Sequence, residues 1–240
     1  MTIESTSTRF NFAQVPILLR GEVQPIQLWI ARWSATRMVL YVAIVCAGTA
    51  MFGAAVGSWH DPLQALYTAI KFPLIVLLTA LGNGLLNGML APLLGINISF
   101  RQSMLAVLMS FTIAATILGA FSPLVGFLIW NAPALAVRTA DAANTHSFIL
   151  VTVVALIAMA GIAANIRLLQ LLRQLSGSAK SARRTLLAWL AGNLLLGSQV
   201  SWILRPFVGS PSLPVEFVRR DALHGNFFES IFHALQKLFS

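Results

Sequence analysis

The sequence predicts an all-α integral membrane protein, a helical bundle of about five transmembrane helices with an amphipathic interfacial helix at each end. The first observation is composition: 58% of the 240 residues are apolar and 10% are charged, whereas soluble domains average about 45–50% apolar and 25% charged. The second is that charge-free runs recur at about 20 residues, the length that a helix needs to cross the hydrocarbon core. Seven acidic and sixteen basic residues supply too little polar surface for a soluble domain.

Five apolar runs lie in the central part of the chain, with one further segment before them and one after them. The expected parts are a cytoplasmic segment with an interfacial helix at 1–37, a transmembrane bundle at 38–205, and an outer proline-rich connector with an amphipathic helix at 206–240. The predicted spans are 38–59, 72–94, 104–121, 147–165 and 185–204. In the third span, Ser122 and Pro123 are expected to break the helix before a short apolar piece continues to Trp130. The polar N-terminus does not resemble a cleavable signal peptide.

Charged residues mark the boundaries of the second and fifth spans. Lys71 precedes the second span, and no Lys or Arg is expected in the middle of any span. The fifth span ends at Arg205, and Pro206 disfavours helical backbone in the residue before it. Span and helix are therefore expected to end together, with the guanidinium of Arg205 extending to the headgroups.

The distribution of basic residues predicts the orientation. Ten of the sixteen Lys and Arg residues lie in the N-terminal segment and the loops 95–103 and 167–184, on one side of the membrane. Cytoplasmic loops are enriched in these residues, so the N-terminus is predicted to be cytoplasmic and the C-terminus outside, in the inner (plasma) membrane of a bacterium. The net charge of +9 indicates that basic residues face the anionic headgroups of membrane lipids on the cytoplasmic side. Nucleic-acid binding is not expected.

Two amphipathic stretches flank the bundle. In PIQLWIARWSATR, which ends at Arg37, large apolar residues recur at helical spacing from Ile26 to Trp33, as in a helix that lies in the membrane interface. In GNFFESIFHALQKLFS, Asn226 is expected to cap a helix whose third residue is Glu229. This last helix is interpreted either as a clamp against lipid or the bundle, or as a docking helix for a partner.

Polar and small residues inside the spans are candidates for function, because polar side chains in lipid usually face protein or water. The candidate helix-packing or pore-lining residues are Asn83, Gly84, Asn87, Gly88, Asn193 and Gln199. The two asparagines of the second span are four residues apart and share a helix face, and the glycines beside them permit close approach of another helix. The polar residues either form interhelical hydrogen bonds, worth about 0.6 kcal/mol each, or line a conduction path.

No catalytic, cofactor-binding or metal-binding motif is found. Phosphate-binding glycine loops, HExxH and GxSxG are absent from the sequence, and no acidic residue occurs in a predicted span, which disfavours proton-coupled transport. The single cysteine, Cys46, excludes an intramolecular disulfide. Glu229 and His233 are four residues apart, a spacing that could present both side chains to one metal ion on the outer side.

Two segments carry a family resemblance. They are IKFPLIVLLTALGNGLLNGMLAPLLGINISFRQ and SWILRPFVGSPSLPVEFVRRDALHGNFF, and the matching pieces are Lys71-Phe72-Pro73, Ser99-Phe100-Arg101-Gln102, Arg205-Pro206-Phe207, Gly209-Ser210-Pro211 and Gly225-Asn226-Phe227. The chain resembles a group of bacterial multi-pass membrane proteins whose plan is similar to the five-span Yip superfamily of Rab-interacting membrane proteins. The resemblance implies five spans and no activity. The Asp-Leu-Tyr-Gly-Pro motif of the eukaryotic proteins is absent, so binding of a small GTPase is not implied.

The leading functional hypothesis is non-enzymatic: a scaffold or accessory subunit of a membrane assembly, with a protein partner or self-association through its helix faces and terminal helices. The alternative is a small oligomeric channel or carrier lined by the intramembrane asparagines and glutamine. An outer-face metal-dependent enzyme is a third hypothesis, based on the histidines. No cofactor is expected.

Overall fold

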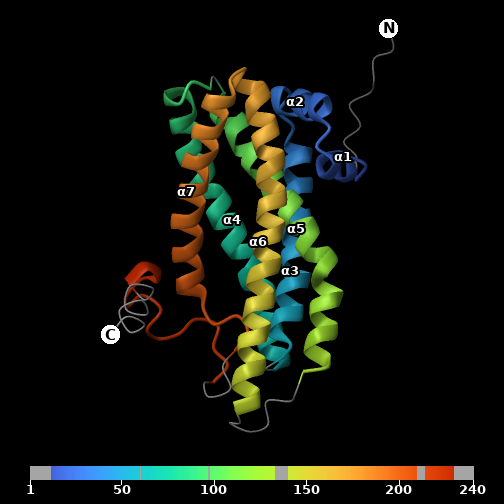
Figure 1. The fold of residues 1–240 in the computed structure, drawn as a ribbon, viewed down its shortest axis with the longest axis vertical. Coiled ribbons are helices and arrows are strands. Elements are labelled where there is room, and N and C mark those ends of the chain that lie inside the picture. Colours follow the sequence, from blue (N-terminus) through green and yellow to red (C-terminus); the bar gives the residue numbers. More distant parts are fainter. Residues whose placement is uncertain (1–11, 60, 97, 133–139, 210–213, 230–240) are drawn as a thin grey trace.

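The structure, a computed structural model, describes residues 12–59, 61–96, 98–132, 140–209 and 214–229. The described residues form seven helices and no strand. Five of the helices are long and apolar enough to cross a membrane, which confirms the predicted all-α membrane bundle. These five helices run along the long axis of the molecule and alternate in direction (Figure 1).

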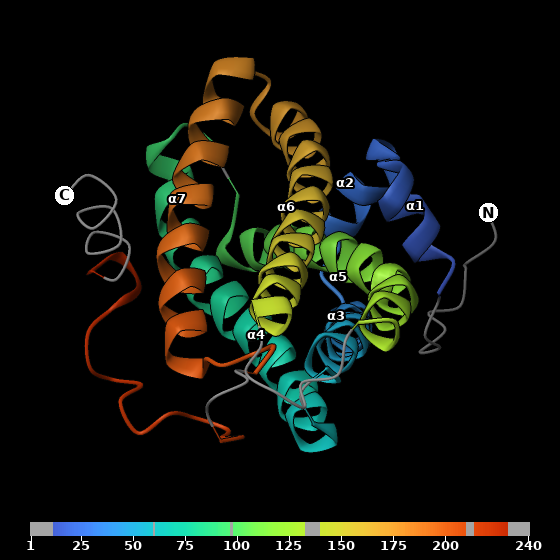
Figure 2. The same cartoon turned by 60° about the horizontal axis from the view of Figure 1, so that its bottom comes forward.

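Two short helices precede the five long ones. The helices are α1 Gln14–Arg20, α2 Val23–Ala31, α3 Ala35–Gly57, α4 Pro62–Leu93, α5 Phe100–Trp130, α6 Ala140–Ser176 and α7 Ala179–Leu204. Helix α3 packs against α4 and α5, whereas α7 packs against α4 and α6. Helix α4 therefore lies between α3 and α7 (Figure 2).

Helices α3 and α5 make the most extensive contact in the bundle, and glycines lie where they cross. A Cβ atom on Gly119 of α5 would lie 2.9 Å from the Cα atom of Gly48 of α3, and a Cβ atom on Gly48 would overlap the carbonyl oxygen of Ala115. Small residues allow two backbones to touch, and van der Waals packing of this kind drives helix association in lipid.

Helix α5 corrects the third predicted span. It does not break at Ser122 and Pro123 but continues through them to Trp130. Proline has no N–H to donate to the carbonyl oxygen four residues earlier, which is that of Gly119. The hydroxyl of Ser122 donates to this oxygen at 2.7 Å. The serine thus supplies the hydrogen bond that the proline removes, as serine side chains do in membrane helices.

Helix α4 corrects the second predicted span, because the helix begins at Pro62 instead of residue 72. The carboxylate of Asp61 accepts a hydrogen bond from the backbone N–H of Leu63 at 2.7 Å, and proline is favoured as the first residue of a helix. Lys71 consequently lies inside the helix, where it is fully buried. Lys71, which was expected to precede this helix, is therefore part of it, in the half nearer Pro62.

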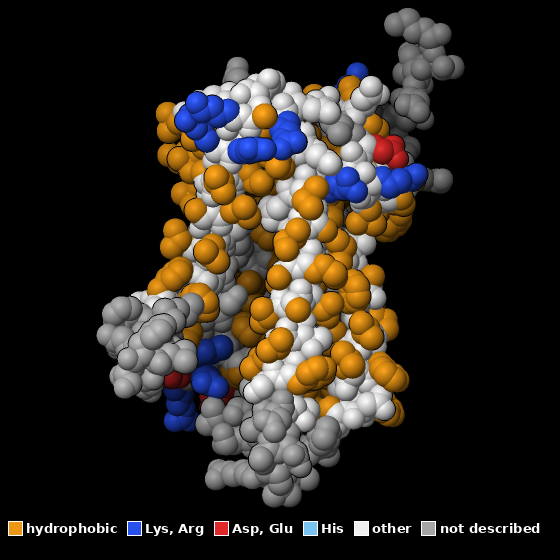
Figure 3. Space-filling model, in the orientation of Figure 1, with side chains coloured by type: hydrophobic (Ala, Val, Ile, Leu, Met, Phe, Trp, Pro, Cys, Tyr) orange, Lys and Arg blue, Asp and Glu red, His pale blue; other side chains and the backbone are white. Residues whose placement is uncertain are grey.

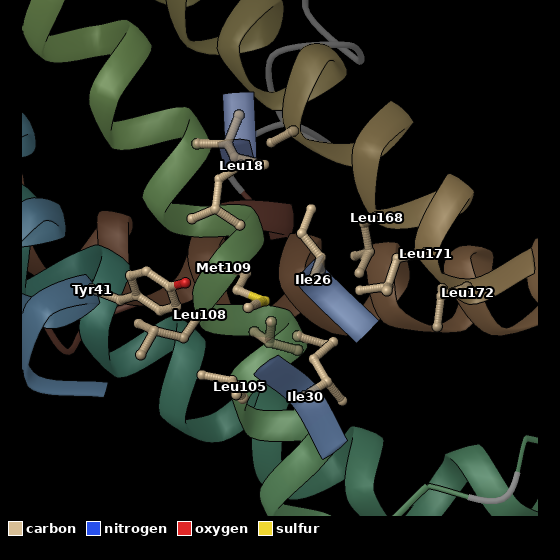
Figure 4. Packing of buried hydrophobic residues seen from close by; sticks show 14 of the residues in the cluster. Leu18, Ile26, Ile30, Tyr41, Leu105, Leu108, Met109, Leu168, Leu171 and Leu172 are labelled. Atoms are coloured by element: carbon tan, nitrogen blue, oxygen red, sulfur yellow. The ribbon is translucent and has the colours of Figure 1, made fainter. Parts of the chain in front are cut away.

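Helices α1 and α2 close one end of the core. Leu18 of α1 and Ile26 and Ile30 of α2 are buried among leucines of α5 and α6 (Figure 4). Burial of one such side chain is worth about 1.5–3 kcal/mol, so both short helices are fastened to the bundle. Helix α1 was not predicted.

The amphipathic stretch predicted to reach Arg37 ends earlier, because α2 stops at Ala31 and α3 begins at Ala35. The guanidinium Nη1 of Arg37 donates to the carbonyl oxygens of Trp29 at 2.9 Å and of Arg32 at 3.1 Å. These bonds satisfy carbonyl groups at the C-terminal end of α2 that have no partner within the helix. Arg37 of α3 thus caps the C-terminal end of α2.

Candidate functional site

Three fully buried polar side chains lie on one face of α4. Gln64, Thr68 and Lys71 are each 0% exposed. Their spacing of four and three residues places them one above another along the helix. A buried lysine is uncommon unless it is paired, and in a membrane helix an ionisable residue marks a site that requires explanation.

These three side chains bind the backbone that follows α7. The ammonium Nζ of Lys71 donates to the carbonyl oxygens of Pro206 at 2.8 Å and Glu216 at 3.4 Å. The amide Nε2 of Gln64 donates to the carbonyl oxygens of Pro206 at 3.1 Å and Phe207 at 2.9 Å. The hydroxyl of Thr68 lies 2.7 Å from the oxygen of Phe207. We call Gln64, Thr68 and Lys71 the tail-binding site, and residues 205–229 the tail.

Aromatic rings surround the ammonium group of Lys71. Its Nζ lies 5.3 Å from the ring centre of Phe217 and 6.0 Å from that of Phe207. The ring of Phe207 also packs edge-on against that of Phe72, with ring centres 5.6 Å apart. Neither of the two ion pairs among the described residues includes Lys71. Carbonyl oxygens and ring faces therefore stabilise its charge, as cation–π contacts can when they are desolvated.

Arg205 joins the end of α7 to the tail. Helix α7 ends at Leu204, so helix and apolar run stop together as predicted. The guanidinium lies 3.7 Å from the ring centre of Trp202, donates to that residue's carbonyl oxygen at 2.7 Å, and pairs with Asp221 at 3.3 Å. Arg205 thus binds groups of both α7 and the tail.

The rest of the predicted boundary motif follows at once. Pro206 and Phe207 occupy the tail-binding site, and Gly209 has a φ of 85°, a left-handed conformation that favours glycine. Pro211 lies outside the described residues. The contact of the tail with Lys71 was not predicted, although Lys71-Phe72 and Arg205-Pro206-Phe207 are both pieces of the family resemblance.

A second polar contact joins α4 to α7. The amide Nδ2 of Asn83 donates to Oδ1 of Asn193 and to the carbonyl oxygen of Trp189. Gly192 permits this approach, because a Cβ atom there would lie 2.7 Å from Oδ1 of Asn83. Asn83 and Asn193 are therefore brought together, 110 residues apart in the sequence.

The other candidates within the spans lie elsewhere. A Cβ atom on Gly84 would meet the sulfur of Met104, and one on Gly88 would lie 2.6 Å from the ring of Phe100, so both glycines face α5. Asn87 is 1% exposed, and neither its Nδ2 nor its Oδ1 has a hydrogen-bond partner among the described residues. Gln199 lies partly buried on α7, six residues beyond Asn193.

We expect replacement by leucine to change the free energy of unfolding differently at the two asparagines of α4. Asn83→Leu removes two interhelical hydrogen bonds, so the free energy of unfolding should fall by about 1 kcal/mol, at about 0.6 kcal/mol per bond. Asn87→Leu removes a buried amide without a partner, so stability should be unchanged or higher. Reversible unfolding of each variant in detergent measures both effects. Equal losses in the two variants would contradict this assignment.

One residue of the predicted metal-binding pair lies outside the described residues. Glu229 is described, but His233 lies in the range 230–240, which is not. Within the described ranges, no three His, Cys, Asp or Glu side chains come close enough to hold a metal ion. No known protein family, curated protein or solved structure matches the chain.

Proposed function

We propose that the protein is a non-enzymatic scaffold or accessory subunit of an assembly in the inner membrane of a bacterium. The observation that carries the proposal is the tail-binding site. Its polar groups bind the protein's own backbone at Pro206, Phe207 and Glu216. Because these hydrogen-bond donors are already used within the protein, we interpret the site as structural and not as a substrate-binding site. Their effect is to give the tail a fixed place at one end of the bundle.

The tail presents apolar side chains from this fixed place. Leu223 is 82% exposed and Phe228 is 38% exposed. The backbone N–H of Glu229 donates to Oδ1 of Asn226 at 2.9 Å, the bond expected of a helix cap at this asparagine; residues 230–240, over which the sequence predicts the helix, lie outside the described residues. Large exposed apolar patches rimmed by polar residues mark sites of interaction with proteins or membranes, and in the proposed role these two side chains contribute to such a patch. This favours docking of a partner at the tail.

Native mass spectrometry of the protein released from its own membrane tests the proposal. We expect a stoichiometric second subunit on the wild-type chain, and its loss when Leu223→Asp and Phe228→Asp are combined. Leu187→Asn, a change at an exposed α7 residue far from the tail, is the matched control and should keep the second subunit. Detection of the 25.9 kDa chain alone, as monomer or homo-oligomer, would contradict the accessory role.

A channel or carrier is the second candidate. Asn83 and Asn193 line one cavity between α4, α5, α6 and α7, together with Asn165, which favours this reading. Measurement of solute flux through vesicles that contain the reconstituted protein separates the channel from the scaffold. Loss of flux in the double variant Asn83→Leu with Asn87→Leu, with the fold intact, would support a pore. Loss of stability or assembly without any wild-type flux would support packing.

The proposed orientation places the turn between α6 and α7 in the cytoplasm. Four exposed basic side chains gather there, visible at the upper end in Figure 3: Arg173, Lys180, Arg183 and Arg184. The one acidic side chain described at this end, Glu22, pairs with Arg20 at 3.4 Å. This excess of positive charge suits a surface of anionic lipid headgroups. We also propose that the chain belongs to the bacterial group with the Yip-like plan.

We expect thiol labelling to report this orientation. In a Cys46→Ala background, Val218→Cys in the tail should react with a membrane-impermeant maleimide in intact spheroplasts. Ala179→Cys, at the start of α7, should react only after the membrane is opened. Both sites are exposed in the structure. The reverse pattern would invert the proposed topology.

A further inference from the structure

An open cleft lies between the end of α5 and the beginning of α6. Its volume is about 440 Å³. The two helices diverge towards this end of the bundle, which is the lower end in Figure 1 and comes forward in Figure 2. The cleft is thus a space that the two helices leave between them, at the end of the bundle where the tail is bound.

The inner wall of the cleft is apolar. Val125 and Ile129 of α5 and Ile149 and Val153 of α6 line it, and each pair, four residues apart, shares a helix face. These four side chains are at most 7% exposed and belong to one core cluster. The cleft therefore reaches the packed core of the bundle.

The polarity of the lining changes along the cleft. Asn131, which directly follows α5, and Thr145, near the start of α6, lie at the same end. From Thr145 to Val153 a helix rises by about 12 Å. Of the described residues that line the inner end, Thr152 alone is polar, and a threonine hydroxyl in a helix can bond to the backbone of its own helix. The cleft thus has a polar end and an apolar interior.

The cleft opens sideways at the depth of the hydrocarbon. The apolar stretch of α5 extends to Trp130, and that of α6 begins at Ser147. Phe148 lines the cleft but is still 60% exposed, and Val151, one turn further along α6, is 69% exposed. The surroundings of the opening are therefore lipid chains.

The lining limits what can fill the cleft. A bound water molecule requires two to four polar partners, which the apolar interior does not offer, and an empty space deprives the wall atoms of contacts. Ligand pockets of about 300–1,000 Å³ typically have apolar walls and a few polar groups. An acyl chain matches the interior, and polar atoms at its head match the two polar residues.

These polar residues can bind the head of a phospholipid. The amide Nδ2 of Asn131 already donates to the carbonyl oxygen of Phe127 at 2.8 Å, which leaves Oδ1 as an acceptor. The hydroxyl of Thr145 can donate to an ester or phosphate oxygen. Both groups lie at the end of the cleft where the hydrocarbon gives way to headgroups.

We infer that this cleft is a phospholipid-binding site, which holds one acyl chain against the core of the bundle. The chain lies between α5 and α6, and its ester end lies at Asn131 and Thr145. A lipid bound in this way exchanges more slowly than the lipid around the bundle. The inference is independent of the accessory role, because a scaffold and a channel could both bind it.

Photocrosslinking of the full chain tests the inference. The protein is reconstituted in vesicles of phosphatidylethanolamine and phosphatidylglycerol, with a phosphatidylethanolamine that carries a diazirine near the end of one acyl chain. After transfer into detergent and removal of free lipid, irradiation should label Ile149 and Val153. Val154, which is 63% exposed at the same depth of α6, should lose its label. Equal loss at Val153 and Val154 would overturn the inference.

Two variants place the retained lipid in the cleft. Thr152→Trp fills the interior and should abolish the retained label. Val151→Trp makes the same large replacement at an exposed neighbour that does not line the cleft, and should keep the label. Retention in a folded Thr152→Trp protein would also overturn the inference. If this variant does not fold, the comparison of Val153 with Val154 in the wild-type chain still decides.

Discussion

Gly48→Ala should lower the free energy of unfolding by about 1–3 kcal/mol or more, the range for an overpacked core. The added methyl group would overlap the carbonyl oxygen of Ala115, a backbone atom that cannot move without the whole of α5. Because α3 and α5 form the most extensive helix contact, separating them weakens the packing on both. Thermal or denaturant unfolding in detergent measures the loss.

Gly126→Ala provides the control, since this glycine also lies in α5 and a Cβ atom there meets nothing within 4 Å. Alanine is favoured over glycine within helices by about 0.5–1 kcal/mol, so this variant should be as stable as the wild type or more so. Similar losses at both glycines would show that helix contact is not what Gly48 provides.

Lys71→Met should release the tail while leaving the bundle folded. Methionine retains the length of the side chain but removes the donor to Pro206 and Glu216. Hydrogen bonds to charged groups are worth about 1.5–3 kcal/mol. Removal of the buried charge also ends its desolvation cost, which offsets the effect on overall stability. The loss should therefore be local to the tail.

Hydrogen exchange followed by mass spectrometry measures this release. A loss of about 2 kcal/mol corresponds to about thirtyfold faster exchange at the amides of 207–209 and 215–217. Lys180→Met makes the same replacement at an exposed lysine of the opposite end and should leave these amides unchanged. Unaltered exchange in Lys71→Met would refute the role of its ammonium group in holding the tail.

The span count and the end of α7 could be predicted from sequence, because lipid imposes a local requirement. A segment that crosses the membrane must satisfy its own backbone hydrogen bonds over about 20 apolar residues, and this leaves a continuous pattern. The cap at Asn226 was predictable for the same reason, since the capping bond spans three residues. The Asp61-Pro62 signature of a helix start was also present, but the charge of Lys71 was interpreted as a boundary instead.

The tail-binding site could not be predicted in this way. Gln64 and the carbonyl oxygen of Pro206 are 142 residues apart, and a backbone carbonyl has no signature in the sequence. The same separation hides the contact of Asn83 with Asn193, for which only residue type, and not pairing, was visible. Pro123 shows a smaller failure: the neighbouring hydroxyl that rescues the helix lies one residue away, but its hydrogen bond depends on a side-chain conformation.

The position of Lys71 has a consequence for biogenesis. Chains are made from the N-terminus, so α4 enters the membrane long before Pro206 and Glu216 leave the ribosome. Until then the ammonium group has none of the carbonyl acceptors that it binds in the finished bundle. The segment that leaves the ribosome last is thus the one that supplies the partners of the buried lysine.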